Sequence, residues 1–169
     1  SIDIVQAHSN ITVINQENLS LSVARNNGIA KATGEYIFMP DSDDLVIENS
    51  LSVLLNKALE TKADIVVADF LGMTSEEIES FEGVDQKIVE FKEKSNEQLF
   101  LEDLNPNHCY VWRNLYRKSF LDENHIRFIP GIRYQDVPFT HECYLKAKKC
   151  VKASWLLNIY RTRRPGSKS

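Results

Sequence analysis

The distribution of apolar and polar residues predicts alternating strands and helices in the first seventy residues. Three short apolar runs, at residues 11–14, 35–39 and 63–70, have the length and the side-chain content of buried strands. Between them, residues 20–31 and 45–62 carry apolar side chains at helical spacing. Strand, helix, strand, helix, strand is the order that builds a parallel sheet with crossover helices.

The rest of the chain continues this pattern with one change of character. Amphipathic spacing predicts three further helices, and an apolar run predicts a closing strand, at residues 96–104, 114–125, 136–150 and 154–160. Residues 71–98 are acid-rich, and we expect a surface insertion or an edge hairpin there. With 169 residues, the chain has the length of one ordinary domain, and we expect residues 1–169 to form a single α/β domain.

Composition and charge exclude several classes of protein. The content of 43% apolar and 26% charged residues is typical of a soluble globular core. A formal charge of -4, from 24 acidic and 20 basic residues, gives no basic excess, so nucleic acid is not expected as a partner. Residues 1–10 lack the features of a signal peptide, and no apolar run approaches the roughly 18 residues that span a bilayer. These observations predict a cytoplasmic location.

The cysteines do not predict a disulfide framework. Cys109, Cys143 and Cys150 are odd in number and lack C-x-x-C spacing, so we expect reduced thiols. A metal site built from His108, Cys109, His141 and Cys143 is conceivable. Such sparse pairs are more often packing residues, which is the interpretation we favour.

Three aspartates follow the second predicted strand directly: Asp41, Asp43 and Asp44. In a parallel sheet, this is the end at which ligands bind. Two carboxylates about 5 Å apart repel by roughly 3 kcal/mol at an effective dielectric constant near 20, so a cation would compensate them in a cleft. Carboxylates suit Mg²⁺ or Mn²⁺, which take further ligands from water and substrate phosphates. The alternative is that Asp43 or Asp44 caps the following helix.

The segment "NITVINQENLSLSVARNNGIAKATGEYIFMPDSDD" resembles the middle of family 2 glycosyltransferases, which have the GT-A fold. The similarity includes Asn18, the "ARN" of residues 24–26, Gly28, the "ATGEYI" of residues 32–37 and the aspartate loop, in that order. It continues more loosely through "CYVWRNLYRKSFL", "RYQDVPF" and "IYRTRRPGS". The resemblance implies an α/β fold of the GT-A-like, Rossmann-like kind, with a mostly parallel sheet and flanking helices.

The resemblance also implies roles for the residues at its motif positions. Asp41 and Asp43 would form the D-x-D that holds the divalent cation against the diphosphate of the donor, with Asp44 as a supporting neighbour. Arg25 and Asn18 would lie beside the nucleotide. The implied reaction moves a sugar with inversion from a nucleotide donor, commonly UDP-linked, to a glycan or lipid-linked acceptor.

An inverting transfer needs a base on the face opposite the leaving group. By similarity to the Glu-Asp motif of the family, this base would be Asp136, although Gln135 replaces the usual glutamate. The alternative interpretation makes Asp136 an N-cap, since Pro138 and an amphipathic stretch follow. Trp112 is a further candidate, for the acceptor pocket.

The chain departs from the family at its start, where the earlier strands that hold the nucleotide base and ribose do not occur. We therefore expect an N-terminally truncated fold with weak donor binding, and self-association at an uncovered sheet edge. A cluster of basic residues follows towards the end of the chain, and its default interpretation is a solvated face: Lys146, Lys148, Lys149, Lys152, Arg161, Arg163 and Arg164. The functional alternative is that the cluster neutralises a diphosphate or an anionic membrane surface that carries the acceptor, which would imply peripheral membrane association.

Two other functions fit parts of the sequence. One is a non-catalytic fragment, similar to a glycosyltransferase, that binds carbohydrate or a partner chain. The other is a phosphatase of the haloacid dehalogenase type, in which Asp41 would be the nucleophile. That reading leaves the "ARN" and "GEYI" matches unexplained.

Overall fold

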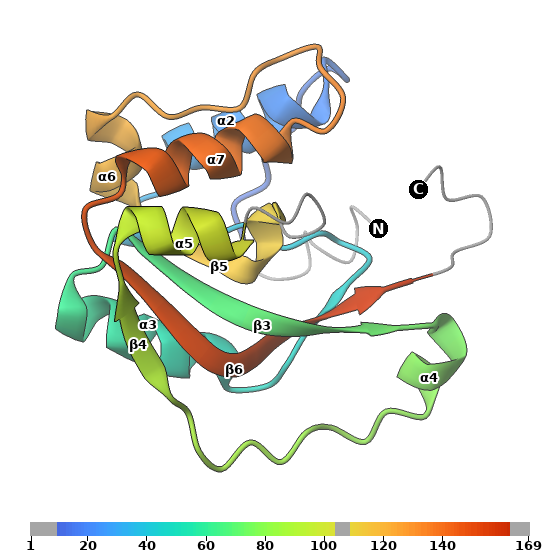
Figure 1. The fold of residues 1–169 in the computed structure, drawn as a ribbon. Coiled ribbons are helices and arrows are strands. Elements are labelled where there is room, and N and C mark those ends of the chain that lie inside the picture. The colour runs from blue at the N-terminus through green and yellow to red at the C-terminus, as the bar shows by residue number, and fades with distance from the viewer. Residues whose placement is uncertain (1–9, 104–108, 163–169) are drawn as a thin grey trace.

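The computed structural model describes residues 10–103 and 109–162 (Figure 1). These residues form a mixed sheet with the strand order β1-β5-β3-β6-β2, and β4 pairs with another part of β6. The strands are β1 (Tyr36–Phe38), β2 (Leu45–Val46), β3 (Ile65–Met73), β4 (Phe91–Lys94), β5 (Asn114–Arg117) and β6 (Cys150–Arg161). The segment 71–98 contributes the end of β3 together with β4.

Helices cover both faces of the sheet. They are α2 (Leu21–Lys31), α3 (Ser50–Thr61), α4 (Ser75–Glu79), α5 (Asn96–Asp103), α6 (Lys118–Glu123) and α7 (Asp136–Lys146), with the 3-10 helix η1 (Val111–Arg113) before β5. Figure 1 shows α2, α6 and α7 above the sheet and α3 below it. The side chains of β3 alternate accordingly. Ile65 and Val67 pack with α2, α5, α6 and α7, whereas Val66 and Ala68 pack with α3.

The expectation of a mostly parallel sheet is wrong. Among the described strands, β3 and β6 form the parallel pair, and the other pairs are antiparallel. The physical reason is β5, because residues 114–117 were expected to be helical and instead enter the sheet between β1 and β3. Both neighbours are antiparallel to β5, so β1, β3 and β6 still run in the same direction. The predicted crossover through α3 therefore exists, but it passes over one strand.

The expectation of a buried strand at residues 11–14 is also wrong. These residues are extended, but within the described part of the chain no strand pairs with them. Ile11, Val13 and Ile14 are 47%, 41% and 41% exposed. A β-branched run predicts a strand only where a neighbouring strand supplies the ladder hydrogen bonds.

None of the described helices has the length and apolar character needed to cross a bilayer.

Candidate functional site

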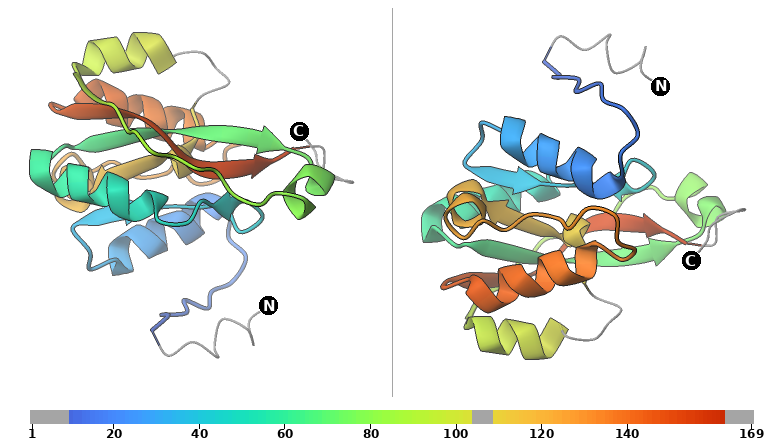
Figure 2. Two further views of the ribbon diagram at one scale, coloured as in Figure 1. Left: turned by 90° about the horizontal axis from the view of Figure 1, so that it is seen from below. Right: turned by 90° about the horizontal axis from the view of Figure 1, so that it is seen from above.

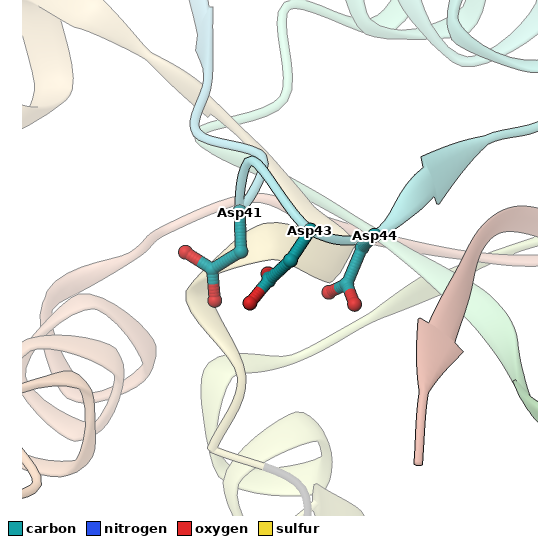
Figure 3. Close-up of side chains that lie close together, drawn as sticks. All are labelled: Asp41, Asp43 and Asp44. Atoms are coloured by element: carbon teal, nitrogen blue, oxygen red, sulfur yellow. The ribbon is translucent and has the colours of Figure 1, made fainter. Parts of the chain in front are cut away.

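The aspartate loop connects β1 with β2. Its turn is closed by the Asp44 N–H, which donates to the Asp41 carbonyl at 3.3 Å. All three carboxylates project from the same side of the loop (Figure 3). One oxygen of each of Asp41, Asp43 and Asp44 lies within 4.8 Å of the other two. The loop therefore concentrates negative charge at the carboxyl end of β1.

The aspartates do not cap the next helix. That helix, α3, begins at Ser50, and its N-cap is Asn49, whose side chain makes no capping hydrogen bond. The interpretation of Asp43 or Asp44 as a helix cap is therefore wrong. Two intervening residues, Leu45 and Val46, pair with β6 as β2, which separates the loop from α3.

Arg161, the last residue of β6, fixes the aspartate loop from the other side. Its N–H donates to Asp44 Oδ1 and its Nε donates to the Asp43 carbonyl, both at 3.0 Å. A third donor, Nη1, reaches Ser75 Oγ at 3.1 Å. The sequence identified Arg161 only as one of several basic residues, because its partners in the aspartate loop lie more than a hundred positions away.

Asp44 carries the clearest sign that the loop suits a cation. Its Oδ2 is buried and has no hydrogen-bond partner. Burial raises the pKa of the Asp44 carboxyl, the Arg161 N–H lowers it, and the charge of Asp41 raises it again. A buried carboxylate oxygen without a partner, beside two further carboxylates, fits a hard divalent cation such as Mg²⁺ or Mn²⁺.

Arg25 and Asp41 form an ion pair at the edge of a cleft. Arg25 Nη2 donates to Asp41 Oδ1 at 2.6 Å, and the arginine side chain is 11% exposed. The cleft has a volume of about 510 Å³ between α2 and the end of β1, and its lining includes Arg25, Gly28, Asp41 and Ser42. Two residues that the sequence assigned to donor binding therefore meet directly. Asn18, the third, is exposed before α2, in a tight turn in which the Leu19 N–H donates to the Glu17 carbonyl at 2.8 Å.

Asp136 is the first residue of α7 and is half-buried. The N-cap of this helix is Gln135, whose side chain makes no capping hydrogen bond, so the interpretation of Asp136 as an N-cap is wrong. Gln135 Oε1 is buried without a partner among the described residues. In Figures 1 and 2 the N-terminal ends of α2 and α7 lie at the same end of the molecule as the loop after β1.

An aromatic cluster lies between the aspartate loop and Asp136. The near-parallel rings of Tyr110, Trp112 and Tyr160 form a triangle, in which the Trp112 centroid lies 4.7 Å from Tyr110 and 5.6 Å from Tyr160, and the two tyrosine centroids are 6.0 Å apart. Tyr160 directly precedes Arg161. Burial raises the pKa of Tyr110, and the neighbouring Tyr160 and Asp136 raise it further. Trp112 is only 4% exposed, so the accessible part of this cluster belongs to the two half-buried tyrosines.

The other basic residues of the C-terminal part, as far as the structure describes them, have their partners away from the aspartate loop. Three of the lysines pair with glutamates elsewhere, as Lys146–Glu142, Lys149–Glu93 and Lys152–Glu102. Lys148 is exposed, and Arg163 and Arg164 lie outside the described residues. Arg161, by contrast, contacts this loop through Asp43 and Asp44.

Among the described cysteines and histidines, Cys109 and His141 form a pair, and no cluster suited to a metal ion includes them. Cys109 Sγ lies 3.1 Å from His141 Nε2, and His108 is outside the described residues. In the part of the chain that the structure describes, the aspartates are the one group of three or more side chains suited to holding a metal ion. Cys109, Cys143 and Cys150 are free thiols and buried, as expected.

Comparisons with known proteins agree with these features. Residues 1–124 match the family model described as glycosyl transferase family 2. The chain is 32% identical over 161 residues to the glycosyltransferase EpsJ of Bacillus subtilis, covering 94% of this chain and 47% of EpsJ. It is 32% identical over 143 residues to the poly(ribitol-phosphate) beta-glucosyltransferase of Bacillus spizizenii, covering 84% of this chain and 21% of that protein.

The fold is similar to that of solved glycosyltransferases. The Staphylococcus aureus TarS structure (residues 1–349) with UDP-GlcNAc superposes with a TM-score of 0.73 at 22% identity, covering 98% of this chain and 47% of TarS. This similarity confirms the GT-A-like α/β class. The chain spans about half the length of EpsJ and of this TarS chain.

Proposed function

The chain belongs to glycosyl transferase family 2, and we propose that it transfers a sugar with inversion from a nucleotide diphosphate donor, a UDP-sugar, to a hydroxyl of a glycan or lipid-linked acceptor. Family membership overturns the phosphatase reading, in which Asp41 was a nucleophile. Relatives with structures in complex with UDP-GlcNAc and with UDP support the choice of a uridine donor.

One observation carries the proposal: three carboxylates converge beside a cleft, and one buried oxygen of Asp44 lacks a partner. Asp41, Asp43 and Asp44 would hold Mg²⁺ or Mn²⁺. Such a cation, when bound, offsets the negative charge that develops on the diphosphate leaving group. Arg161 keeps the loop in place through Asp43 and Asp44.

Arg25 is placed to bind the diphosphate itself. Its guanidinium is held at the lining of the cleft by Asp41, and a planar guanidinium matches phosphate oxygens through paired hydrogen bonds. Asn18 is proposed as a further donor contact at the start of α2. The apolar remainder of the cleft lining suits the less polar parts of a nucleotide sugar.

Asp136 is proposed as the base. The acceptor oxygen attacks the anomeric carbon, the bond from that carbon to the diphosphate oxygen breaks, and the acceptor proton passes to the Asp136 carboxylate. Tyr110 is close enough to Asp136 for that charge to raise the tyrosine pKa, and the half-buried rings of Tyr110 and Tyr160, which stack on each other, would form one wall for the reacting sugar.

We further propose that the protein works in the cytoplasm, at the inner face of the membrane where lipid-linked acceptors reside. The basic residues of the C-terminal part of the chain would contribute attraction to an anionic surface. Nucleic acid is not proposed as a partner.

Calorimetric titration with UDP and a UDP-sugar, with and without Mn²⁺, tests the proposal. We expect binding to require Mn²⁺ and to weaken about tenfold or more in Asp43→Ala, because a carboxylate ligand is lost. Asp136→Asn should bind the donor normally but release UDP about a hundredfold more slowly, since only proton transfer is affected.

Glu35→Ala is the matched control. Glu35 is exposed at the opposite end of β1, so this variant removes the same charge without touching the loop. Unchanged metal-dependent binding in Asp43→Ala would contradict the proposed cation site. Metal-dependent donor binding without any sugar transfer would instead favour the non-catalytic, carbohydrate-binding alternative.

A further inference from the structure

Asn26 connects α2 to the segment that leads into the proposed base. Asn26 Nδ2 donates to the Phe128 carbonyl at 2.8 Å, and the Phe128 N–H donates to Asn26 Oδ1 at 2.9 Å. One side-chain amide thus satisfies both backbone groups of a residue 102 positions away. Phe128 is 1% exposed, so water has little access to replace this amide.

Phe128 in turn packs on the first turn of α7. Its ring stacks on that of Phe139, with the centroids 3.9 Å apart and the planes 2° apart. Phe139 lies three residues after Asp136, so both occupy the same face of the helix. The edge of Phe139 meets Tyr116 of β5, which anchors the pair in the core.

The neighbouring residue on α2 reaches the aspartate loop. Arg25 forms the ion pair with Asp41, and its guanidinium carbon lies 5.4 Å from the centre of the Phe128 ring. Two consecutive residues of one helix therefore contact the loop with the proposed metal ligands and the segment before the proposed base. The path runs from Asp41 through Arg25, Asn26 and Phe128 to Phe139.

We propose that Asn26 is a positioning residue that sets the place of Asp136 relative to Asp41. The inference rests on the proposed function, since it gives Asp136 its role as the base. Asn26 itself touches neither donor nor acceptor in this proposal. It acts by fixing the Phe128 backbone, on which the start of α7 packs.

Asn26→Ala removes both hydrogen bonds, and Asn27→Ala is the matched control. Asn27 is also half-buried on α2, but its amide donates to Gln16 at 2.7 Å and does not contact Phe128. In Asn26→Ala, we expect amide hydrogen exchange at Phe128 to rise about tenfold and the Asp136 amide resonance to shift. Asn27→Ala should change neither.

Asn26→Asp keeps the acceptor for the Phe128 N–H and loses the donor to its carbonyl. We expect an intermediate increase in exchange, which distinguishes a specific contact from general unfolding. Equal effects of Asn26→Ala and Asn27→Ala, or an unmoved Asp136 resonance in Asn26→Ala, would overturn the proposal. These measurements need no activity, so they decide it even if the chain transfers no sugar.

Kinetics complete the test. With Mn²⁺ and a UDP-sugar, kcat for UDP release should fall about 10- to 100-fold in Asn26→Ala while KM for the donor changes little, because a displaced base affects the reacting step alone. Asn26→Asp should recover part of the loss. A rise in KM with an unchanged kcat would contradict a role through Asp136. If the unmodified chain released no UDP, this result would count against the proposed function. The hydrogen-exchange measurement would still decide whether Asn26 positions Asp136.

Discussion

Arg25 binds the same carboxylate of Asp41 that would bind a metal ion. Its Nη2 contacts Oδ1 at 2.6 Å, and the side chain is 11% exposed, so solvent screens the pair only partly. In the chain without ligands, the guanidinium offsets one of the three clustered charges. A cation that binds to this loop must therefore either share the Asp41 carboxylate with Arg25 or displace the Arg25 guanidinium from it.

Arg25→Met tests this competition. Methionine keeps an unbranched side chain over the Phe128 ring but removes the positive charge. We expect Mn²⁺ alone to bind about three- to tenfold more tightly, since roughly 1 kcal/mol of repulsion and competition is removed. The affinity for UDP in the presence of Mn²⁺ should fall about tenfold, because the charge-assisted hydrogen bonds to phosphate are lost. Both constants can be measured by calorimetry.

Arg25→Lys is the control, because it retains the charge at this position. Its Mn²⁺ affinity should stay near that of the unmodified chain. Its UDP affinity should fall modestly, because lysine lacks the planar guanidinium that forms paired hydrogen bonds with phosphate. Weaker Mn²⁺ binding in Arg25→Met would contradict the competition and would mean that Arg25 orients Asp41 for the metal.

At the scale of elements, α2 combines a structural and a binding role. Ser20 caps its start, since Ser20 Oγ accepts from the Val23 N–H at 3.3 Å, and Ile29 packs in the core. Gly28 sits inside the helix and lines the cleft. A Cβ added there would meet no atom within 4 Å, so the glycine leaves open space at the cleft.

Gly28→Ala should therefore change stability and binding in opposite directions. Glycine inside a helix costs about 0.5–1 kcal/mol relative to alanine, so the melting temperature should rise by about 1–4 °C. If the donor occupies the cleft, the added methyl group should weaken UDP binding. Thermal denaturation and titration of the same sample give both values.

Ala30→Gly on the exposed side of α2 is the matched control. It should lower stability by a similar amount and leave UDP binding unchanged. Equal UDP affinities for Gly28→Ala and the unmodified chain would place the donor outside this cleft.

The elements that the sequence predicted well are those with long, local patterns. The helices at α2, α3 and α7 and the strands β3 and β6 have enough residues for periodicity or continuous burial to identify them. β5 was not predicted, because its four residues, Asn114–Arg117, have the pattern of the first turn of an amphipathic helix and enter the sheet only through long-range pairing. The prediction for residues 11–14 was wrong for the opposite reason. These residues have the composition of a strand, but no described strand pairs with them.

The same limit applies to the candidate site. The aspartate loop was predictable because Asp41, Asp43 and Asp44 are adjacent in sequence. The contacts of Arg161 with Asp43 and Asp44, and of Asn26 with Phe128, span 102 to 118 residues and leave no local signature. Sequence thus identified the charged groups, and the tertiary structure added the residues that hold them.

At the scale of the whole molecule, the β1 side of the sheet is open. Among the described strands, β1 pairs with β5 and forms the end of the order. Figure 2 (left) shows α2 and the segment from residue 10 beside this end. Leu19 and Leu21 are 63% and 55% exposed there, and Leu21 lines the cleft next to β1. Open strand edges flanked by apolar side chains favour association between chains.

We therefore predict that the chain self-associates through this side, as the sequence led us to expect. Leu21→Glu should shift the equilibrium towards the monomer, because association would bring a carboxylate from each copy into an apolar contact. Ile88→Glu is the matched control, since Ile88 is 83% exposed in the segment before β4, away from β1. Sedimentation equilibrium over a wide range of chain concentrations measures both. An interface at β1 would be contradicted if the unmodified chain stayed monomeric at every concentration. It would also be contradicted if Leu21→Glu and Ile88→Glu dissociated to the same extent.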